Sequence, residues 1–512
     1  MKDNSLIEGG ILVLNLGGNL AQYYAKKIRK MNVFSSILYV GKVEIDEINK
    51  LKPNGILICG EADDIKDTII DKGIFSLGIP VLALSDAMLV MCKILNGKVE
   101  KKSFQGEKIV DNTSEKSLLI KDMESFSANF DNNSVVKELP ETFNVTATCE
   151  GYPSVIEDTQ RKLFGCQFRL VENKTQYANN ILRYFVFDVC NCNRDWVAEK
   201  FMLRSIALLK EAIGDGHVLL GLSGGVDSAV VAALLFKAIG ERLHCVFVDH
   251  GFMRKDEPEL VKKVFTENFP VSLTCVDAGK RFMDKLQGVS DAEQKRKIIG
   301  AEFISVFLEE AKKIGKLDHF AQGTIYPDVI ESGVGSGGEL IKSHHNVGGL
   351  PELLGFNSLI EPLRWLFKPE VRLLGTALGL PSHMVDRQPF PGPGIAIRCL
   401  GTLTAERVEM VRLSDAILRE EVDNFGLTYI ADQFFTVLTG VRSVGINEGK
   451  RSYFEAIAIR AVKTDDFMIA ENVYYPKELL DTVSKRILSE VPCVSRVLLD
   501  ISPKPPASIE WE

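Results

Sequence analysis

Short apolar runs alternate with amphipathic stretches through the first 195 residues of the chain. The apolar runs end in glycine or polar residues, and the stretches between them have the spacing of helices. The runs are Gly10–Leu16, Gly55–Cys59 and Pro80–Leu84, and the helical stretches include Ala21–Met31 and Ala87–Leu95. This alternation predicts an α/β domain built on a mainly parallel sheet.

The same alternation continues from residue 196 to residue 395. Strands are predicted at Val218–Leu222, Leu243–Val248, Phe269–Val276 and His319–Ile325, and helices at Trp196–Ile213, Ala229–Leu235 and Asp291–Lys313. Apolar strands that alternate with helices are typical of parallel sheets covered on both faces. We therefore expect a second α/β domain with a parallel sheet.

The last part of the chain has a different pattern. It opens with a long helical stretch, and two alternating, strand-like segments and another helix follow. These segments are Leu400–Phe425, Phe434–Leu438, Tyr453–Val462 and Lys477–Glu490. The pattern predicts a small α+β domain. Three domains are expected, at residues 1–195, 196–395 and 396–512.

A glycine turn joins the predicted strand Val218–Leu222 to the helix after it. It reads Ser223-Gly224-Gly225-Val226-Asp227-Ser228, followed by Ala229. Two glycines permit positive φ and close approach of a ligand, and the free N–H groups of a helix start suit an anion. A tight turn without a ligand is the alternative. The turn resembles the phosphate-binding loop of the ATP pyrophosphatases, which split ATP into AMP and pyrophosphate.

Polar residues follow the end of the next strand, at Val248. The segment V-D-H-G-F-M-R-K-D-E places Asp249, His250 and Arg254 just beyond that end. Ligands of open α/β sheets bind at the carboxyl edge. We expect Val248 to lie beside bound ATP and the polar residues after it to lie at the ligand-binding edge, although a solvated loop has the same composition.

Two carboxylates suggest a magnesium site. Asp328 and Glu331 are three residues apart and follow the predicted strand His319–Ile325. Together with Asp227 they offer the oxygen ligands that suit Mg²⁺ on a triphosphate. Two surface carboxylates at the start of a helix are an equally good interpretation.

A glycine-rich segment follows at residues 333–338. It matches Gly-x-Gly-x-x-Gly but does not follow a strand, so the dinucleotide-binding interpretation fails. A flexible lid is the better interpretation. Lys342, His344 and His345 come directly after it, and we expect them to neutralise the leaving pyrophosphate.

The first 195 residues resemble the class I glutamine amidotransferases. The matching segments are I-L-V-L-N-L-G-G, P-V-L-A-L-S-D-A-M-L-V-M and F-G-C-Q-F-R-L-V-E. The family has a cysteine at the position of Ser85, and a histidine and a glutamate at the positions of Arg169 and Val171. No histidine precedes His217. Since a nucleophile of this kind needs a neighbouring base, we predict an inactive, degenerate domain.

Longer motifs in residues 219–398 are similar to the GMP synthetases. They are Q-G-T-I-Y-P-D-V-I-E-S, I-K-S-H-H-N-V-G-G-L-P, E-P-L-R-W-L-F-K and Q-P-F-P-G-P-G-I-A-I-R, and the ending K-P-P-A-S-I-E-W-E also matches. The resemblance implies an enzyme that adenylates XMP with Mg-ATP and then lets ammonia displace AMP to give GMP. With the glutaminase residues absent, we expect it to depend on ammonia.

The same resemblance assigns roles in the last domain. It implies that Lys504 contacts the phosphate of XMP, that Glu510 holds the purine and that Arg254 faces the nucleotide. It also implies a homodimer formed through residues 396–512. The segment around Asn447 and Glu448 departs from the family pattern, which leaves the details of that loop open.

Composition narrows the class of protein further. The net charge of −8 argues against broad binding of nucleic acids. The start of the chain lacks a signal-peptide pattern, and no apolar run reaches the ~20 residues of a membrane span. The ten cysteines include no Cys-x-x-Cys. We expect a cytoplasmic protein with reduced thiols and no membrane contact.

Three other interpretations stay open. A tRNA-thiolating or other ATP pyrophosphatase would bring basic patches or paired cysteines, which are missing. A regulatory protein derived from a synthetase would have lost the residues of the ATP site, yet Asp227, Asp328, Glu331 and Lys342 are present. A glutamine-hydrolysing enzyme with an unusual triad, or with a partner, is the third.

Overall fold

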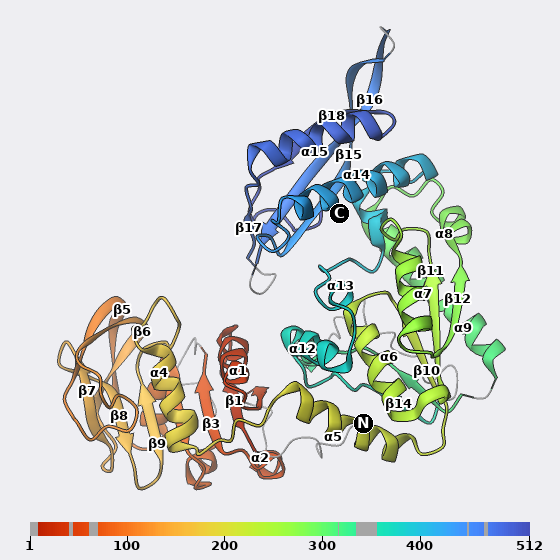
Figure 1. The fold of residues 1–512 in the computed structure, drawn as a ribbon. Helices are drawn as coiled ribbons and strands as arrows, with labels where there is room; N and C mark the ends of the chain where they lie inside the picture. The colour runs from red at the N-terminus through yellow and green to blue at the C-terminus, as the bar shows by residue number, and fades with distance from the viewer. Residues whose placement is uncertain are drawn as a thin grey trace. The chain divides into compact units, whose positions relative to one another are not determined.

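Figure 1 shows the computed structural model of the chain. It describes residues 9–39, 45–60, 70–315, 317–333, 356–447, 450–464 and 469–512. Contacts divide the chain into two compact units, residues 2–201 and residues 202–512. The predicted domain boundaries at 195/196 and 395/396 stay predictions.

The unit of residues 2–201 is built on one sheet with helices packed on it. Its strands are β1 (Ile11–Asn15), β2 (Ser35–Tyr39), β3 (Gly55–Cys59), β4 (Val81–Leu84), β5 (Lys98–Asn112), β6 (Phe126–Glu138), β7 (Asn144–Cys149), β8 (Tyr152–Asp158) and β9 (Leu163–Cys166), and its α-helices are α1 (Leu20–Lys30), α2 (Ile45–Leu51), α3 (Asp86–Ile94) and α4 (Ala178–Arg183). The strand order is β2-β1-β3-β4-β9-β8-β7-β5-β6.

Only half of this sheet is parallel. Strands β2, β1, β3, β4 and β9 pair in parallel, and β8, β7, β5 and β6 pair antiparallel. The prediction of a mainly parallel sheet therefore missed the second half. Its long strand β5 carries many exposed charged side chains, so it lacks the apolar run of a buried strand.

The unit of residues 202–512 contains a fully parallel sheet in the order β12-β11-β10-β13-β14, as predicted. Its strands are β10 (Val218–Leu222), β11 (Leu243–Asp249), β12 (Ser272–Asp277), β13 (His319–Ala321) and β14 (Ser358–Ile360). The helices are α5 (Ala198–Ile213), which leads in from the first unit, α6 (Val226–Ile239), α7 (Glu257–Glu267), α8 (Gly279–Lys285), α9 (Ala292–Ile314), α10 (Tyr326–Gly333), α12 (Lys368–Leu378) and α13 (Ser382–Val385).

Strand β13 ends four residues earlier than the predicted strand His319–Ile325. At Gly323 the chain passes close to the first turn of α6: an added Cβ would lie 3.3 Å from Cβ of Asp227 and 3.3 Å from the backbone nitrogen of Ser228. A residue with a side chain would not fit at this close contact between Gly323 and α6. The strand therefore ends before it, and the chain continues into α10.

The remaining elements form a second, mostly antiparallel sheet with two helices. They are α14 (Ala405–Asn424), β15 (Gln433–Asn447), β16 (Lys450–Lys463), β17 (Glu471–Asn472), α15 (Lys477–Glu490) and β18 (Val494–Asp500). The predicted helix Leu400–Phe425 begins later, at Ala405, because Gly401 has φ +81° and the Thr404 hydroxyl caps the helix by accepting from Arg407 N at 3.2 Å.

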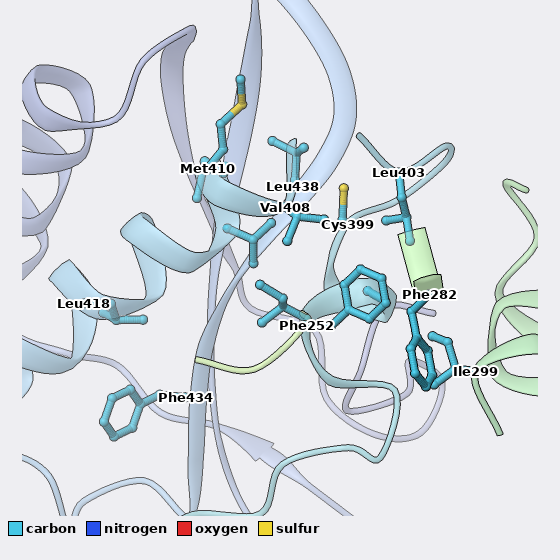
Figure 2. Packing of buried hydrophobic residues seen from close by; sticks show 14 of the residues in the cluster. Phe252, Phe282, Ile299, Cys399, Leu403, Val408, Met410, Leu418, Phe434 and Leu438 are labelled. Carbon is cyan, nitrogen blue, oxygen red and sulfur yellow. The ribbon is translucent and has the colours of Figure 1, made fainter. Parts of the chain in front are cut away.

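One hydrophobic core joins the parallel sheet to these later elements. Figure 2 shows part of it, with Phe252 from the segment after β11, Phe282 from α8, Val408 from α14 and Leu438 from β15. All four side chains are almost fully buried. Residues 202–512 are therefore held together by shared packing across the predicted boundary at 395/396.

The described part of the chain contains no helix that is both long and apolar enough to cross a membrane. All ten cysteines are free thiols, and eight of them are buried. Burial raises the pKa of the Cys92 thiol to about 12, so it is a core side chain rather than a nucleophile.

Candidate active site

The glycine turn after β10 forms a partly exposed loop at the carboxyl edge of the parallel sheet. Gly224 has φ +75°, a conformation that favours glycine. Gly225 is the N-cap of α6 and gives the helix no side-chain cap. The Ser228 hydroxyl accepts from Ser223 N at 3.2 Å, and the Ser223 hydroxyl accepts from Gly225 N at 3.3 Å. Ala229 N donates to the carbonyl of Gly225 in the first turn of α6. The hydrogen bonds of Ser223 and Ser228 therefore hold the shape of the loop.

The Asp227 carboxylate in this loop is paired with a lysine that the sequence reasoning did not assign. Lys368 Nζ, at the start of α12, lies 2.8 Å and 2.7 Å from the two carboxylate oxygens of Asp227. Both side chains are about one-third exposed. The motif E-P-L-R-W-L-F-K contains Lys368, but only the fold brings it to the loop. A cation therefore already stands beside the predicted phosphate position.

A second basic residue that was not predicted, Arg387, contacts the backbone of the loop. The Arg387 guanidinium donates to the carbonyl of Gly224 and pairs with Glu257 of α7. Burial, together with repulsion from Arg419, lowers the pKa of Arg387 to about 10. This contact fixes the carbonyl of the one residue in the loop that has positive φ.

The predicted magnesium site stays a prediction, because only two of its three carboxylates, Asp227 and Asp328, have described side chains. Asp328 Oδ2 accepts from Ile325 N at 2.9 Å and so caps the start of α10. The side chain of Glu331 lies outside what is described. Among the described residues no three His, Cys, Asp or Glu side chains are placed to hold a metal ion. The predicted lid and Lys342, His344 and His345 also lie outside the described residues.

The segment after β11 is a tight turn rather than a solvated loop. Val248 is buried and pairs with β12. Asp249 Oδ1 accepts from Gly251 N at 2.8 Å, and His250 Nδ1 accepts from Phe252 N at 3.0 Å. Burial raises the pKa of Asp249 and lowers the pKa of His250 to about 4. Both side chains serve to hold the turn that presents Arg254.

A pocket of about 670 Å³ lies next to this turn, within the unit of residues 202–512. Its walls include Arg254, Arg387, Asp415, Arg419 and Phe434. The Arg254 guanidinium lies 4.4 Å from the ring centre of Phe390 and donates to the carbonyl of Pro389 at 3.4 Å. Carboxylates line the pocket as well, but Arg254, Arg387 and Arg419 bring three partly buried guanidinium groups to it, and such groups suit an anionic ligand.

The end of the chain is held against the same unit by ion pairs. Glu510 accepts from Arg398 through both oxygens, at 3.0 Å and 2.7 Å, and Glu512 Oε2 lies 2.5 Å from Nζ of the fully buried Lys295. The backbone of Lys504 forms an isolated antiparallel β-bridge with Ala470, just before β17. Glu510 thus has a protein partner, and Lys295, part of a K-R-K run on α9, is a buried anchor that the sequence reasoning missed.

Ser85 occupies a sharp turn between β4 and α3 in the first unit. It has φ +55° and is 4% exposed. Its hydroxyl accepts from Asn132 Nδ2 at 3.1 Å, and the same nitrogen donates to Asp86 Oδ1 at 2.9 Å. The turn keeps the geometry that presents a nucleophile, yet the side chain is covered by an amide.

The two other degenerate positions offer no base to Ser85. Arg169 forms an ion pair with Asp131 at 2.6 Å, and its backbone nitrogen donates to Asn129 at 3.2 Å. The carbonyl of Val171 accepts from the backbone of the following turn. Arginine is always charged and cannot accept a proton.

Three family models match successive parts of this chain. A model described as glutamine amidotransferase class-I matches residues 12–198, and one described as NAD synthase matches residues 203–298. A model described as GMP synthase C terminal domain matches residues 420–511. The first match lies within the unit of residues 2–201, and the other two lie within the unit of residues 202–512.

Full-length relatives are similar to the whole chain. Proteins named GMP synthase (glutamine-hydrolyzing) from Acetivibrio thermocellus and Bacillus subtilis are each 46% identical to it. The first comparison covers 98% of this chain and 99% of the relative, and the second covers 99% of both. A protein of the same name from Treponema denticola is 44% identical and covers 98% of this chain and 97% of its own length.

Proposed function

This chain belongs to the GMP synthase family, a family of ATP-using ligases of purine biosynthesis, and on that premise we propose that it makes GMP from XMP, ATP and ammonia. In this reaction O2 of XMP attacks the α-phosphate of ATP and pyrophosphate leaves. Ammonia then adds at C2 and AMP leaves. Most of the catalytic work falls to positioning and to neutralising the phosphate charge.

The glycine turn after β10 is the observation that carries this proposal. Its backbone leads into the start of α6, which has no side-chain cap, and a helix start of this kind suits the β- and γ-phosphates of ATP. Lys368 adds a cation beside Asp227. When bound, Mg²⁺ would neutralise the phosphates; Asp227 fits it as an oxygen ligand, and Asp328 and Glu331 remain candidates.

We place XMP in the pocket beside Arg254, with Lys504 and Glu510 as further contacts. Arg254 is a partly buried cation over the ring of Phe390, an arrangement that suits a nucleotide. Glu510 forms an ion pair with Arg398, so it would contact the purine while this ion pair stays in place.

We also propose that the chain depends on free ammonia. The relatives carry glutamine-hydrolyzing in their names, which favours the alternative of glutamine hydrolysis through an unusual triad or a partner. Three observations oppose that alternative: Ser85 is covered by Asn132, Arg169 is paired with Asp131, and residues 1–216 contain no histidine. A buried hydroxyl without a base is a poor nucleophile.

A homodimer through the last sheet is the third part of the proposal. Val444 and Tyr453 face each other across β15 and β16, and both are about half exposed or more. Ile446, two residues further along β15, is 76% exposed. Exposed apolar side chains grouped on one hairpin are typical of a protein interface.

The test is GMP formation from XMP and Mg-ATP, supplied either with ammonium chloride at alkaline pH or with glutamine. We expect turnover with ammonium and none with glutamine, followed by the absorbance change of XMP to GMP. Equal turnover with glutamine would contradict ammonia dependence and leave the synthetase intact. No GMP in either mixture, with ATP still bound, would favour the regulatory alternative.

A further inference from the structure

Asp415 is a carboxylate buried beneath the pocket. It lies on α14, and its side chain is 2% exposed. One of its oxygens, Oδ2, is 2.6 Å from Nε of Arg419 on the same helix and 3.9 Å from Nε of Arg254, which follows β11. A buried carboxylate is costly unless cations accompany it, so this pairing ties α14 to the turn after β11.

Cations crowd around this carboxylate. Burial, followed by repulsion from Arg419, lowers the pKa of Arg254, and Arg387 and Arg398 lower it further. Asp415 acts in the opposite direction and favours the charged guanidinium. Burial by itself would raise the pKa of Asp415, yet Arg419, Arg254 and Arg398 together lower it. Asp415 therefore stays ionised among these three arginines.

The other groups around Arg254 do not replace this counterion. Its guanidinium contacts the Pro389 carbonyl and the Phe390 ring, which are uncharged. The carboxylate of Glu257 accepts from the backbone nitrogen of Arg254 and pairs with Arg387. Of the described residues, Asp415 alone forms an ion pair with the side chain of Arg254.

We propose that Asp415 is a positioning residue for the nucleotide substrate. By balancing Arg254 and Arg419 it holds two guanidinium groups from different elements side by side at the pocket wall, where they face a purine nucleoside monophosphate. It touches no reacting atom and acts through the arginines. The inference rests on the proposed function, which places XMP beside Arg254.

The variant Asp415→Asn keeps the shape of the side chain and removes its charge. The arginines then repel each other without compensation and lose their alignment, so we expect KM for XMP to rise about 10-fold. KM for ATP should change less than about 2-fold, because the loop at Ser223–Ser228 does not contact Asp415. Direct binding of XMP, followed by calorimetry without ATP, should weaken by the same factor.

Two further variants separate positioning from folding. Asp415→Glu retains the charge and should recover most of the affinity, and it decides the question if Asp415→Asn does not fold. Glu420→Gln is the matched control, since Glu420 lies on the same helix and pairs with Arg486 at 2.9 Å on the surface. We expect it to leave both KM values unchanged.

The outcomes are distinguishable. Unchanged or tighter XMP binding by Asp415→Asn, or an equal rise in both KM values, would overturn the positioning role while the wild-type protein still makes GMP. If the wild-type protein binds no XMP, the placement of XMP in this pocket fails and the role of Asp415 fails with it.

Discussion

The two units share a strand–turn–helix connection, but different side chains surround the turn in each. In each, a buried strand ends in a sharp turn whose tip has positive φ, and a helix follows. At the tip of the first turn is Ser85, with φ +55°, and in the second it is Gly224, with φ +75°. Neither helix has a side-chain cap, but the Ser85 hydroxyl is covered by Asn132, whereas the turn at Gly224 has the ion pair of Asp227 and Lys368 beside it.

The difference lies in the side chains around each turn and not in the backbone of the turn. Packing of β4 and α3 maintains the strained turn at Ser85, where the hydroxyl accepts from the Asn132 amide. Around Gly224 the polar partners are charged and face solvent in part, as in the pair of Asp227 and Lys368. Backbone geometry follows from the scaffold, while chemistry depends on the side chains that surround it.

The largest expected effect is at the charged loop. Asp227→Asn removes the carboxylate that lies beside Lys368 and that we propose as a magnesium ligand. We expect ammonium-supported GMP formation to fall about 100-fold or more, as for the loss of one electrostatic group in an active site. Steady-state assays with saturating XMP measure the loss.

Ser85→Ala is the matched change in the other turn. It removes the hydroxyl at the tip and should leave ammonium-supported turnover unchanged, since no step is assigned to it. Asp227→Asn with activity within about 2-fold of wild type would remove the loop from the mechanism. A clear loss in Ser85→Ala would show that the two turns are coupled.

A smaller effect is expected from the amide that covers Ser85. Asn132→Ala leaves the Ser85 hydroxyl and the Asp86 carboxylate without this donor. We expect the unit of residues 2–201 to lose about 1–3 kcal/mol of stability, with no change in ammonium-supported turnover. Hydrogen exchange of β4 and α3 measures the stability of this region.

Asn133→Ala provides the comparison for that experiment. Asn133 is the next residue of β6, and it is exposed and accepts from Gln105 at 3.2 Å. Loss of the Asn133 side-chain amide should change hydrogen exchange in β4 and α3 little. If Asn132→Ala lowered turnover as strongly as it raised exchange, the first unit would have a part in the reaction that we do not assign to it.

Elements with a continuous apolar run could be predicted from the sequence. The strands Gly55–Cys59 and Val218–Leu222 begin and end where the pattern placed them, as does the helix Lys477–Glu490. The antiparallel strands β5 and β6 were missed because exposed charges interrupt their apolar positions.

The loop was found from the sequence, but its partners were not. Lys368 is 141 residues away from Asp227 along the chain, and nothing in its local pattern distinguishes it from a surface lysine. Asp415 lies on a helix rich in charges, where a buried carboxylate has no local signature. Ion pairs between distant segments depend on the packing of the whole unit, which periodicity does not report.

The smallest expected difference between the units is their response to acid. His250 has a folded-state pKa of about 4, below the ordinary value of about 6.5, so the unfolded chain binds its proton first as pH falls. The contribution of His250 to the stability of residues 202–512 should be complete well above pH ~6.5 and decline toward pH 4, with about 1.4 kcal/mol lost at pH 5.5. Residues 2–201 contain no histidine and lack this contribution. His250→Asn keeps an acceptor for Phe252 N and should flatten this decline in stability, measured by urea unfolding at a series of pH values. The control is His383→Asn, which changes an exposed histidine and should leave the decline as it is. Equal slopes in both variants would assign the decline to other groups, such as His244.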